Sequence, residues 1–494
     1  MKIFYVSSEV APFAKTGGLG DVTGALPKYL KQLGHDIRVM MPNYKLINER
    51  KYVLRDVIRL QGLELKIGNE IYQANGKSAF LPDSKVQVYF LDNKFFFDRE
   101  GLYCDSKTGL DYQDNAERFI FFSKGCLETL KLLHWQPDII HCNDWQTALI
   151  PLFLKSIYKE DPFFKNTKTL LTIHNLAYQG NFEPSVVQKA GLQDHISYSD
   201  SPVDYCGKFS FLKAGLEYAD LLSTVSETYV NDIQESPDYG YGFEGFLKKR
   251  KNDLFGIING IDIQVWNPET DKLIPFNYNK RTLSDKYKNK EELLKRFNLK
   301  FNENIPVIST ISRLVDQKGF DLITAIIDQL MQLDLQLIIL GIGEQKYHSF
   351  FRKIQKKYPT KFGIELSFNN PVAHLIEAGS DIYLMPSRFE PCGLNQLYSL
   401  KYGTIPIVRK TGGLADTIEN IDINTISGTG FVFKKYDSNE LLKIIKNALK
   451  LFNKKDIWVK IIQNAMKQDF SWKSSAQKYV KLYQKLMNTK TNKK

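Results

Sequence analysis

Short apolar runs alternate with segments of helical periodicity along most of this chain, and no other feature constrains its fold as strongly. Apolar runs at residues 3–6, 37–41, 86–91, 138–142, 169–173 and 221–225 are predicted strands. Between them, apolar residues recur at three- and four-residue spacing, as in residues 21–33 and 115–133. Strands that alternate with helices form βαβ units and parallel sheets. The pattern therefore predicts an α/β protein with doubly wound sheets.

A second series of the same kind follows a polar stretch. The first series pauses at residues 266–270, and the chain stays polar to about residue 298, with a charge-rich surface helix expected over residues 280–296. Apolar runs return at residues 305–311, 335–340, 382–385 and 404–408, and the rest of the chain has helical periodicity. We expect two Rossmann-like domains, residues 1–264 and 265–470, followed by a C-terminal segment, residues 471–494, with a basic tail at 485–494.

One short motif occurs once in each half. Lys15-Thr-Gly-Gly-Leu-Gly-Asp21 recurs as Lys410-Thr-Gly-Gly-Leu-Ala-Asp416, and each copy lies between a predicted strand and a predicted helix. Chance is the alternative, since Gly-Gly-Leu is a common triplet, but the shared context favours a repeated loop. Open α/β sheets bind ligands at the carboxyl ends of their strands. Two such loops are therefore expected to line an interdomain cleft between the two facing domains.

The first copy is suited to an anion. Its paired glycines, Gly17 and Gly18, let the backbone approach a ligand, the following helix N-terminus offers free N–H groups, and Lys15 adds a mobile positive charge. The loop is not a P-loop, which needs Gly-Lys-Ser/Thr, and it lacks the third glycine of a dinucleotide fingerprint. A plain tight turn is the alternative for this loop taken alone.

Two loops in the second half carry further charged residues. Arg313 and Lys318 lie five residues apart between a predicted strand and a helix, where two cations can converge on a diphosphate; a solvated pair is the alternative. Glu390 lies in Pro386-Ser-Arg-Phe-Glu-Pro-Cys-Gly-Leu394, whose last two residues begin the next helix. A carboxylate beside a helix N-terminus suits a ligand with hydroxyls at one end and phosphates at the other. A helix-capping carboxylate is the alternative.

Histidines and cysteines complete the candidates. His141 and His174 close two predicted strands, and both are expected to open onto the same cleft. No metal site is expected, because neighbours such as His141 and Cys142 point to opposite faces of a strand and no His-Glu-x-x-His motif occurs. The five cysteines are odd in number and far apart, which indicates reduced thiols in a cytoplasmic protein.

The charge balance favours an anionic partner. Lys and Arg number 67 and Asp and Glu 55, so the formal net charge is +12. The basic run at residues 248–251 is expected to be a solvated helix face, because no nucleic-acid-binding module accompanies it. No apolar stretch approaches the ~20 residues of a membrane span, and no signal peptide is predicted. Neither a nucleic acid nor a membrane is expected as a partner, and the sequence indicates no oligomeric state.

With these residues in view, the sequence closely resembles the bacterial and plant-type glycogen and starch synthases over about residues 1–480. The resemblance rests on six motifs: Lys15-Thr-Gly-Gly-Leu-Gly-Asp21, His141-Cys-Asn-Asp-Trp145, Asn259-Gly-Ile-Asp262, Ser312-Arg-Leu-Val-Asp-Gln-Lys318-Gly319, Pro386-Ser-Arg-Phe-Glu-Pro-Cys-Gly-Leu394 and Lys410-Thr-Gly-Gly-Leu414. It implies the GT-B fold and transfer of glucose from ADP-glucose to the non-reducing end of an α-1,4-glucan, such as a maltooligosaccharide, with retention of configuration and release of ADP. It implies no cofactor besides the ADP-glucose substrate.

The resemblance also assigns roles to residues of this chain. The implied catalytic residues are Glu390, Arg313, Lys318 and His174. The implied substrate-binding residues are Lys15, Gly18, Asp21, Asn259, Cys392, Gly393 and Leu394. In these roles Arg313 and Lys318 neutralise the leaving diphosphate, and Glu390 lies at the donor glucose. The C-terminal helix is expected to cross back onto the N-terminal domain.

Two departures from the family pattern and three alternatives bear on this interpretation. Gln146 stands where the family often has His, and Phe368 stands where it usually has Tyr. A catalytically inactive glucan binder would be expected to lose Glu390, Arg313 or Lys318, and all three are present. A nucleic-acid binder would show basic faces interleaved with aromatic residues. A related GT-B transferase that uses UDP-glucose or makes sucrose-type products is the remaining alternative.

Overall fold

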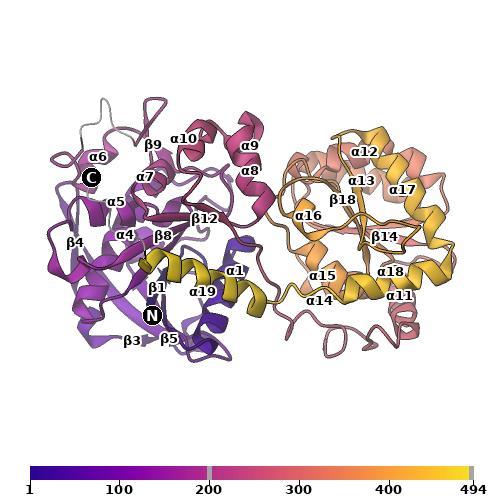
Figure 1. Ribbon diagram of the computed structural model, residues 1–494, viewed down its shortest axis with the longest axis horizontal. Helices are drawn as coiled ribbons and strands as arrows, with labels where there is room; N and C mark the ends of the chain where they lie inside the picture. The colour runs from indigo at the N-terminus through magenta and orange to yellow at the C-terminus, as the bar shows by residue number, and fades with distance from the viewer. Residues whose placement is uncertain (197–202, 489–494) are drawn as a thin grey trace. The chain divides into compact units, whose positions relative to one another are not determined.

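The computed structural model describes residues 1–196 and 203–488, which divide into two compact units (Figure 1). Unit 1 contains Met1–Val225, Val230–Gly260 and the segment from Trp472 onward. Unit 2 contains Ser226–Tyr229 and Ile261–Ser471. The chain therefore passes from unit 1 to unit 2 after Gly260 and returns after Ser471.

Unit 1 is built on a ten-stranded sheet with the order β13-β12-β8-β7-β1-β2-β6-β5-β3, and β4 pairs with β5. The strands from β13 to β6 are parallel, whereas β5 is antiparallel to β6, β3 and β4. These strands are β1 (Lys2–Val6), β2 (Asp36–Pro42), β3 (Arg55–Asp56), β4 (Leu63–Ile67), β5 (Glu70–Phe80), β6 (Gln87–Asp92), β7 (Ile139–Asn143), β8 (Lys168–Ile173), β12 (Leu221–Thr224) and β13 (Leu254–Gly256). A small antiparallel sheet contains β9 (Asn181–Phe182), β10 (Asp204–Tyr205) and β11 (Lys208–Ser210).

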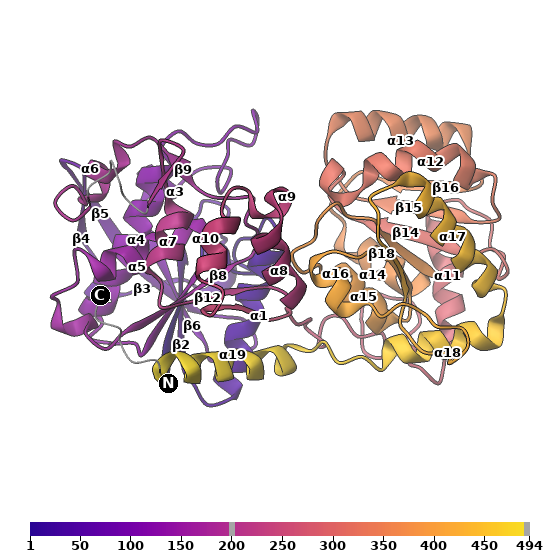
Figure 2. The same cartoon turned by 45° about the horizontal axis from the view of Figure 1, so that its top comes forward.

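Helices cover both faces of this sheet. Figure 2 shows α1 and α19 on one side and α4, α5 and α7 on the other. The helices of unit 1 are α1 (Gly18–Gln32), α2 (Glu49–Tyr52), α3 (Lys94–Phe97), α4 (Asn115–Leu132), α5 (Leu149–Lys155), α6 (Val186–Ala190), α7 (Phe211–Tyr218), α9 (Pro237–Gly240), α10 (Glu244–Lys249) and α19 (Trp472–Asn488). The division between the units falls within α8 (Glu227–Glu235). None of the described helices is both long enough and apolar enough to cross a membrane.

Unit 2 has a six-stranded parallel sheet with the order β16-β15-β14-β17-β18-β19. Its strands are β14 (Val307–Ile311), β15 (Gln336–Leu340), β16 (Phe362–Glu365), β17 (Ile382–Met385), β18 (Ile405–Arg409) and β19 (Phe431–Phe433). Its helices are α11 (Ser284–Arg296), α12 (Phe320–Met331), α13 (Gln345–Lys357), α14 (Asn370–Gly379), α15 (Asn395–Tyr402), α16 (Gly412–Thr417), α17 (Ser438–Phe452) and α18 (Lys455–Met466).

Strand β15, which lies between β16 and β14, shows why unit 2 is doubly wound. Leu337 and Ile339 pack in the larger core cluster, whereas the alternate residues Ile338 and Leu340 pack in a separate cluster with residues of α11 and α14. Successive side chains of a strand point to opposite faces, so a strand buried on both faces is apolar at every position. The continuous apolar run in the sequence therefore correctly predicted a parallel strand covered on both sides.

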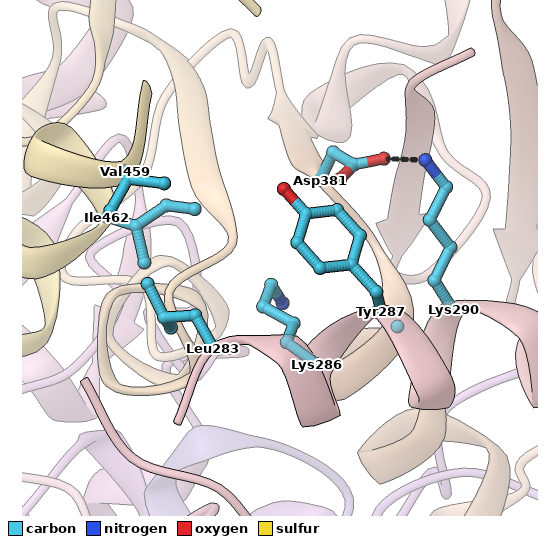
Figure 3. Close-up of a pocket in the computed structure, with 8 residues that line it drawn as sticks. Leu283, Lys286, Tyr287, Lys290, Asp381, Val459 and Ile462 are labelled. Carbon is cyan, nitrogen blue, oxygen red and sulfur yellow. Dashed lines mark ion pairs between the residues drawn. The ribbon is translucent and has the colours of Figure 1, made fainter. Parts of the chain in front are cut away.

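The charge-rich segment 280–296 forms the predicted surface helix from Ser284 onward, but two of its lysines are buried. The helix α11 begins at Ser284, and it buries Lys286 and Lys290 (Figure 3). Lys290 Nζ lies 2.8 Å from Asp381 Oδ2, and Lys286 Nζ donates to Thr404 Oγ1 at 2.8 Å. Burial lowers the pKa of Lys286 to about 7. The exposed Lys288 and Lys295 agree with the predicted surface helix. The two buried lysines were not predicted, because most of their partners lie about 90 residues or more away in sequence, although Lys290 Nζ also donates to Ile305 O, 15 residues away, at 2.8 Å.

The basic run at residues 248–251 is also only partly a solvated face. Lys248, Lys249 and Lys251 are exposed, and α10 ends at Lys249. The guanidinium of Arg250 donates to the carbonyl oxygens of Leu216 and Ala219, at 2.5 and 2.9 Å. These carbonyls lie at the end of α7, where the last C=O groups have no N–H partner within the helix. Arg250 therefore stabilises the C-terminus of a helix.

Candidate active site

The Lys15–Asp21 loop joins β1 to the first turn of α1 in unit 1. Lys15 Nζ lies 2.8 Å from Asp21 Oδ1, and both side chains are partly exposed. Gly18 is the first residue of α1. A Cβ atom on Gly20 would lie 2.4 Å from Lys15 Cβ, so only glycine lets Lys15 pack this closely against the helix. Three residues that the sequence assigned to substrate binding, Lys15, Gly18 and Asp21, thus lie on one loop and one helical turn.

Glu9 lies beneath this loop and was not among the residues predicted from the sequence. Its carboxylate accepts hydrogen bonds from Thr16 N at 2.6 Å, Thr16 Oγ1 at 2.7 Å and Tyr103 OH at 2.7 Å, and the residue is buried. An internal carboxylate therefore binds the backbone directly before α1, whose N-cap is Gly17. The polar run Ser7-Ser8-Glu9 directly after an apolar strand is the signal that could have identified it.

His174 follows β8 and is held in a single tautomer. Its Nε2 lies 2.9 Å from Asn143 Oδ1, and the amide of Asn143 is oriented by a hydrogen bond from its Nδ2 to Val6 O at 3.0 Å. Because Oδ1 can only accept, Nε2 of His174 carries the proton and Nδ1 is an acceptor. Burial lowers the pKa of His174 to about 3, so the imidazole is neutral.

Asp144 supports His174 from a strained position. Its Oδ1 accepts a hydrogen bond from the backbone N of His174 at 2.7 Å. Its backbone has φ 55° and ψ −175°, a region that residues other than glycine rarely adopt and that is concentrated at functional sites. Burial raises the pKa of Asp144 to about 7, against the hydrogen bonds from His174 and Asn175. Asp144 belongs to the motif His141–Trp145, but no role was predicted for it from the sequence.

His141 does not open onto the site, contrary to expectation. It is fully buried in β7, with Nδ1 2.7 Å from Tyr483 OH of α19 and Nε2 2.6 Å from Thr172 Oγ1. The expectation was wrong because β7 continues to Asn143, which makes His141 an interior strand residue. Asn259, which the sequence assigned to substrate binding, is buried after β13, and its Oδ1 has no hydrogen-bond partner among residues 1–196 and 203–488.

In unit 2, the loops after β14 and β17 bring Lys318 and Glu390 together. Lys318 Nζ lies 2.5 Å from Glu390 Oε2, and Ser387 Oγ donates to the same oxygen at 3.3 Å. Gly319 has φ +78°, and a Cβ atom there would lie 2.2 Å from Pro386 O. The backbone of one loop thus approaches the other so closely that only glycine fits.

Arg313 lies on the same loop as Lys318, directly beyond Ser312. Its side chain is exposed and forms no ion pair with any residue that the structure describes. The two cations that the sequence placed together therefore differ: Lys318 already has a carboxylate partner, whereas Arg313 has none within the described chain.

The start of α15 supplies backbone donors beside Glu390. Gly393 has φ +74°, and Leu394 is the N-cap of α15. Within the described part of the chain, the N–H groups of Gly393 and Leu394 have no hydrogen-bond partner. Cys392, the residue before them, is buried. This helix N-terminus therefore retains free donors.

The second copy of the Gly-Gly motif lies behind the Glu390 loop. A Cβ atom on Gly412, which has φ +42°, would lie 2.0 Å from Glu390 O, and Gly413 N donates to the same oxygen at 3.1 Å. Gly17, its counterpart in unit 1, has extended backbone, and a Cβ atom on it would meet no other described residue within 4 Å. The two copies therefore share a place between strand and helix but make different contacts.

The two positions that depart from the family pattern have different surroundings. Phe368 lies between β16 and α14 and is 79% exposed. Gln146 is buried, and its Oε1 has no partner among the described residues. An exposed phenyl ring in the loop after β16 offers a flat apolar face to solvent.

Comparisons with known proteins define the class first. Residues 2–249 match the family model described as the starch synthase catalytic domain, and residues 291–467 match glycosyl transferases group 1. The catalytic domain of Starch Synthase IV from Arabidopsis thaliana, bound to ADP and acarbose, is 30% identical, with a TM-score of 0.90 and 99% of each chain covered. A sucrose-phosphate synthase from Thermosynechococcus elongatus shares the fold, with a TM-score of 0.59 and 16% identity over 98% of each chain. The fold is thus that of a two-domain GT-B glycosyltransferase.

Sequence relatives define the family. A glycogen synthase from Thermosipho africanus is 45% identical over 99% of both chains. A glycogen synthase from Desulforudis audaxviator is 47% identical over 99% of this chain and 97% of the relative. The chain belongs to the glycogen synthase family and has the glycosyltransferase function of that family.

Proposed function

We propose that this chain transfers glucose from ADP-glucose to the non-reducing end of an α-1,4-glucan, with retention of configuration and release of ADP. The observation that carries this proposal is the Lys318–Glu390 pair, 2.5 Å apart, beside the free N–H groups of Gly393 and Leu394. A carboxylate is a good acceptor for sugar hydroxyls, and cations with backbone donors suit a diphosphate. The Arabidopsis structure with ADP and acarbose supports both kinds of substrate.

The chemical step breaks the bond between the anomeric carbon and the diphosphate oxygen. Negative charge then grows on the diphosphate while the sugar becomes cation-like. Arg313, Lys318 and the N–H groups at the start of α15 are aimed at the developing negative charge. Donors and cations fixed in advance stabilise such a transition state more than they stabilise the substrate.

For retention, we propose front-face attack within an ion pair. The acceptor hydroxyl attacks the anomeric carbon from the side that the diphosphate leaves, and its proton passes to the departing phosphate oxygen. The carboxylate of Glu390 is already engaged by Lys318 and by Ser387, which weakens it as a nucleophile. A trapped covalent glucosyl–Glu390 adduct would instead establish double displacement.

The unit 1 residues contribute sugar contacts in this proposal. The neutral imidazole of His174 offers Nδ1 as an acceptor for a sugar hydroxyl, with its other nitrogen held by Asn143. Asn259 has a buried carbonyl oxygen, unpartnered among the residues described, that can accept from a hydroxyl. Lys15, from the loop before α1, and Gly18 and Asp21, from its first turn, bind substrate in this proposal.

We propose that the reaction needs no resident metal or cofactor and runs in the cytoplasm without nucleic-acid or membrane partners. Arg313 and Lys318 supply the positive charge that a metal ion provides in other nucleotide-sugar enzymes. Within the described residues, none of the five cysteines, Cys104, Cys126, Cys142, Cys206 and Cys392, forms a disulfide, which suits a reducing compartment.

The deciding experiment measures ADP and UDP release from the two nucleotide sugars with a maltooligosaccharide acceptor. The proposal expects ADP release matched by elongation of the acceptor by single glucose residues. Preferred release of UDP, or a product of disaccharide size, would establish the related transferase instead.

A further inference from the structure

Arg409 is the last residue of β18 and is buried, with 7% of its surface exposed. Its Nε donates to Ser387 O at 2.9 Å, Nη2 donates to Arg388 O, and Nη1 lies 3.5 Å from Lys434 O. Burying a guanidinium is costly unless its donors are satisfied, and its planar fork fixes the positions of the groups it binds. Arg409 therefore joins the loop after β17 and the segment after β19 to its own strand.

The loop after β17 carries the groups proposed to bind the donor sugar. Ser387, whose carbonyl Arg409 binds, has its hydroxyl 3.3 Å from Glu390 Oε2. Arg388 N donates to Gln317 O at 2.8 Å, next to Lys318 in the neighbouring loop. Arg409 thus holds the two backbone carbonyls that lie two and three residues before Glu390.

The residues directly after Arg409 hold the same loop from its other end. Gly413 N donates to Glu390 O at 3.1 Å, and the close approach of Gly412 to that oxygen leaves no room for a Cβ atom. A short stretch of chain, residues 409–413, therefore fixes the backbone on both sides of the Glu390 side chain.

We propose that Arg409 is a positioning residue for glucosyl transfer, acting through the backbone of Ser387 and Arg388 to place Glu390 against Lys318. This inference rests on the proposed function of Glu390 and Lys318. Loss of the fork lets the loop shift, and a shift of about 1 Å in a reacting geometry costs on the order of 100-fold in rate.

The test compares Arg409→Lys and Arg409→Gln with the matched variants Arg250→Lys and Arg250→Gln. The Arg250 guanidinium also donates to backbone carbonyls, but those belong to Leu216 and Ala219 at the end of α7, neither of them a candidate site residue. For each full-length variant, the unfolding temperature is measured together with kcat and KM per folded molecule. Lysine keeps the positive charge but not the planar guanidinium. Arg409→Lys therefore separates the effect of the charge from the effect of the guanidinium geometry.

We expect all four variants to lower the unfolding temperature, but only the Arg409 variants to lower kcat, by about 100-fold, with the KM for the glucan within about threefold of wild type. A folded Arg409→Lys enzyme with kcat within about threefold of wild type would overturn the proposal. Failure of both Arg409 variants to fold, with both Arg250 variants folded, would overturn it as well, because Arg409 would then serve the folding of unit 2.

The assay uses the nucleotide sugar that the wild-type enzyme prefers. A wild-type enzyme that does not use ADP-glucose would contradict the proposed donor, whereas the comparison of Arg409 with Arg250 would still report on positioning. Failure of the proposed donor and failure of the positioning role of Arg409 are therefore distinguishable.

Discussion

Asp144 and His174 are joined by a hydrogen bond, and their titrations affect stability in opposite directions. Burial raises the pKa of Asp144 to about 7 and lowers that of His174 to about 3, whereas unfolded Asp and His titrate near ~3.9 and ~6.5. Between roughly pH 4 and 6.5, the folded state alone carries the Asp144 proton and the unfolded state alone carries the His174 proton. The Asp144 proton makes stability fall as pH rises, whereas the His174 proton makes it rise. The two contributions therefore cancel over this range.

Replacing either residue should leave only the pH dependence of stability that the other residue causes. In Asp144→Asn, only the His174 effect remains, so the free energy of unfolding should rise from pH 4.5 to 6.5 relative to wild type, by up to ~1.4 kcal/mol per pH unit. In His174→Asn, it should fall over the same range. Urea unfolding at three pH values measures both slopes. Curves for Asp144→Asn and wild type that stay parallel would contradict the prediction.

Arg313 and Lys318 should each be needed for turnover. Arg313→Ala and Lys318→Ala should each lose about 3–4 kcal/mol of transition-state stabilisation, or about 100- to 1,000-fold in kcat/KM. Arg313→Ala is the cleaner change, because Lys318→Ala also removes the partner of Glu390. Lys248→Ala, an exposed lysine of α10, is the control and should keep wild-type activity. Turnover within about tenfold of wild type in both variants would exclude the charge-clamp role.

At the scale of the element, α11 combines a buried ion pair with an exposed one. Lys290 and Asp381 are 1% and 7% exposed at their side chains, whereas Lys288 and Asp285 are 56% and 27% exposed, and both pairs have the same separation of 2.8 Å. A buried charge that loses its partner cannot be solvated, whereas an exposed one can. The two pairs on one helix should therefore differ in their contribution to stability.

Lys290→Met should lower the free energy of unfolding by about 3–5 kcal/mol, because Asp381, which would keep its hydrogen bond from Val307 N, would be left buried without its cationic partner. Lys288→Met should change it by less than about 1 kcal/mol. Denaturant unfolding of the full-length chain measures both. Adding Asp381→Asn to Lys290→Met should recover part of the loss. Equal effects of Lys290→Met and Lys288→Met would show that burial does not govern these pairs.

The sequence predicted strands that are buried on both faces, such as β8, and missed β5, which has one solvated face. The run at 169–173 is apolar because β8 lies inside a parallel sheet. β5 went unpredicted, because in Glu70–Phe80 only Ala74, Gly76 and Ala79 are buried, so the segment has no apolar run. The strand lies in the antiparallel part of the sheet, where side chains can alternate between core and solvent.

The candidate site was predictable only where neighbours in sequence are neighbours in space. The loops with Lys15, Lys318 and Glu390 stood out because glycines, prolines and charges are concentrated between a strand and a helix. Glu9 and Arg409 were not found, because their partners lie 7 to 94 and about 22 residues away, respectively. Long-range carbonyl and N–H contacts leave no periodic pattern in a sequence.

At the scale of the whole molecule, the net charge of +12 consists of charges with very different surroundings. Lys286 and Lys290 are buried, whereas Lys248 and Lys249 are exposed. Of the basic tail predicted at 485–494, Lys485 lies in α19 with its Nζ 4.3 Å from the Phe255 ring centroid, and residues 489–494 lie outside the described residues. The net charge therefore does not report which cations can meet an anion: in the candidate site Lys15 is paired with Asp21 and Lys318 with Glu390, whereas Arg313 forms no ion pair with the residues that the structure describes.

Metal removal should leave the activity in place. After dialysis against a chelator, kcat should stay within about twofold of the untreated enzyme, because the cations of the chain neutralise the diphosphate. The measurement is ADP release in metal-free buffer, with and without added Mg²⁺. A large loss that Mg²⁺ or Mn²⁺ restores would contradict the proposal and assign part of the charge neutralisation to a metal ion.

Because α19 belongs to unit 1 but is synthesised last, the order of synthesis affects when unit 1 can finish folding. Tyr483 of α19 hydrogen-bonds His141, and Ser475 Oγ donates to Ile258 O at 2.7 Å, so unit 1 is incomplete without the end of the chain. The ribosome must first add Ile261–Ser471, which takes roughly 10–40 s at ~5–20 residues/s. Unit 2 can therefore finish folding while the earlier strands β7 and β8 still lack the helix that covers them, so the surface that α19 buries stays exposed in the nascent chain throughout that interval.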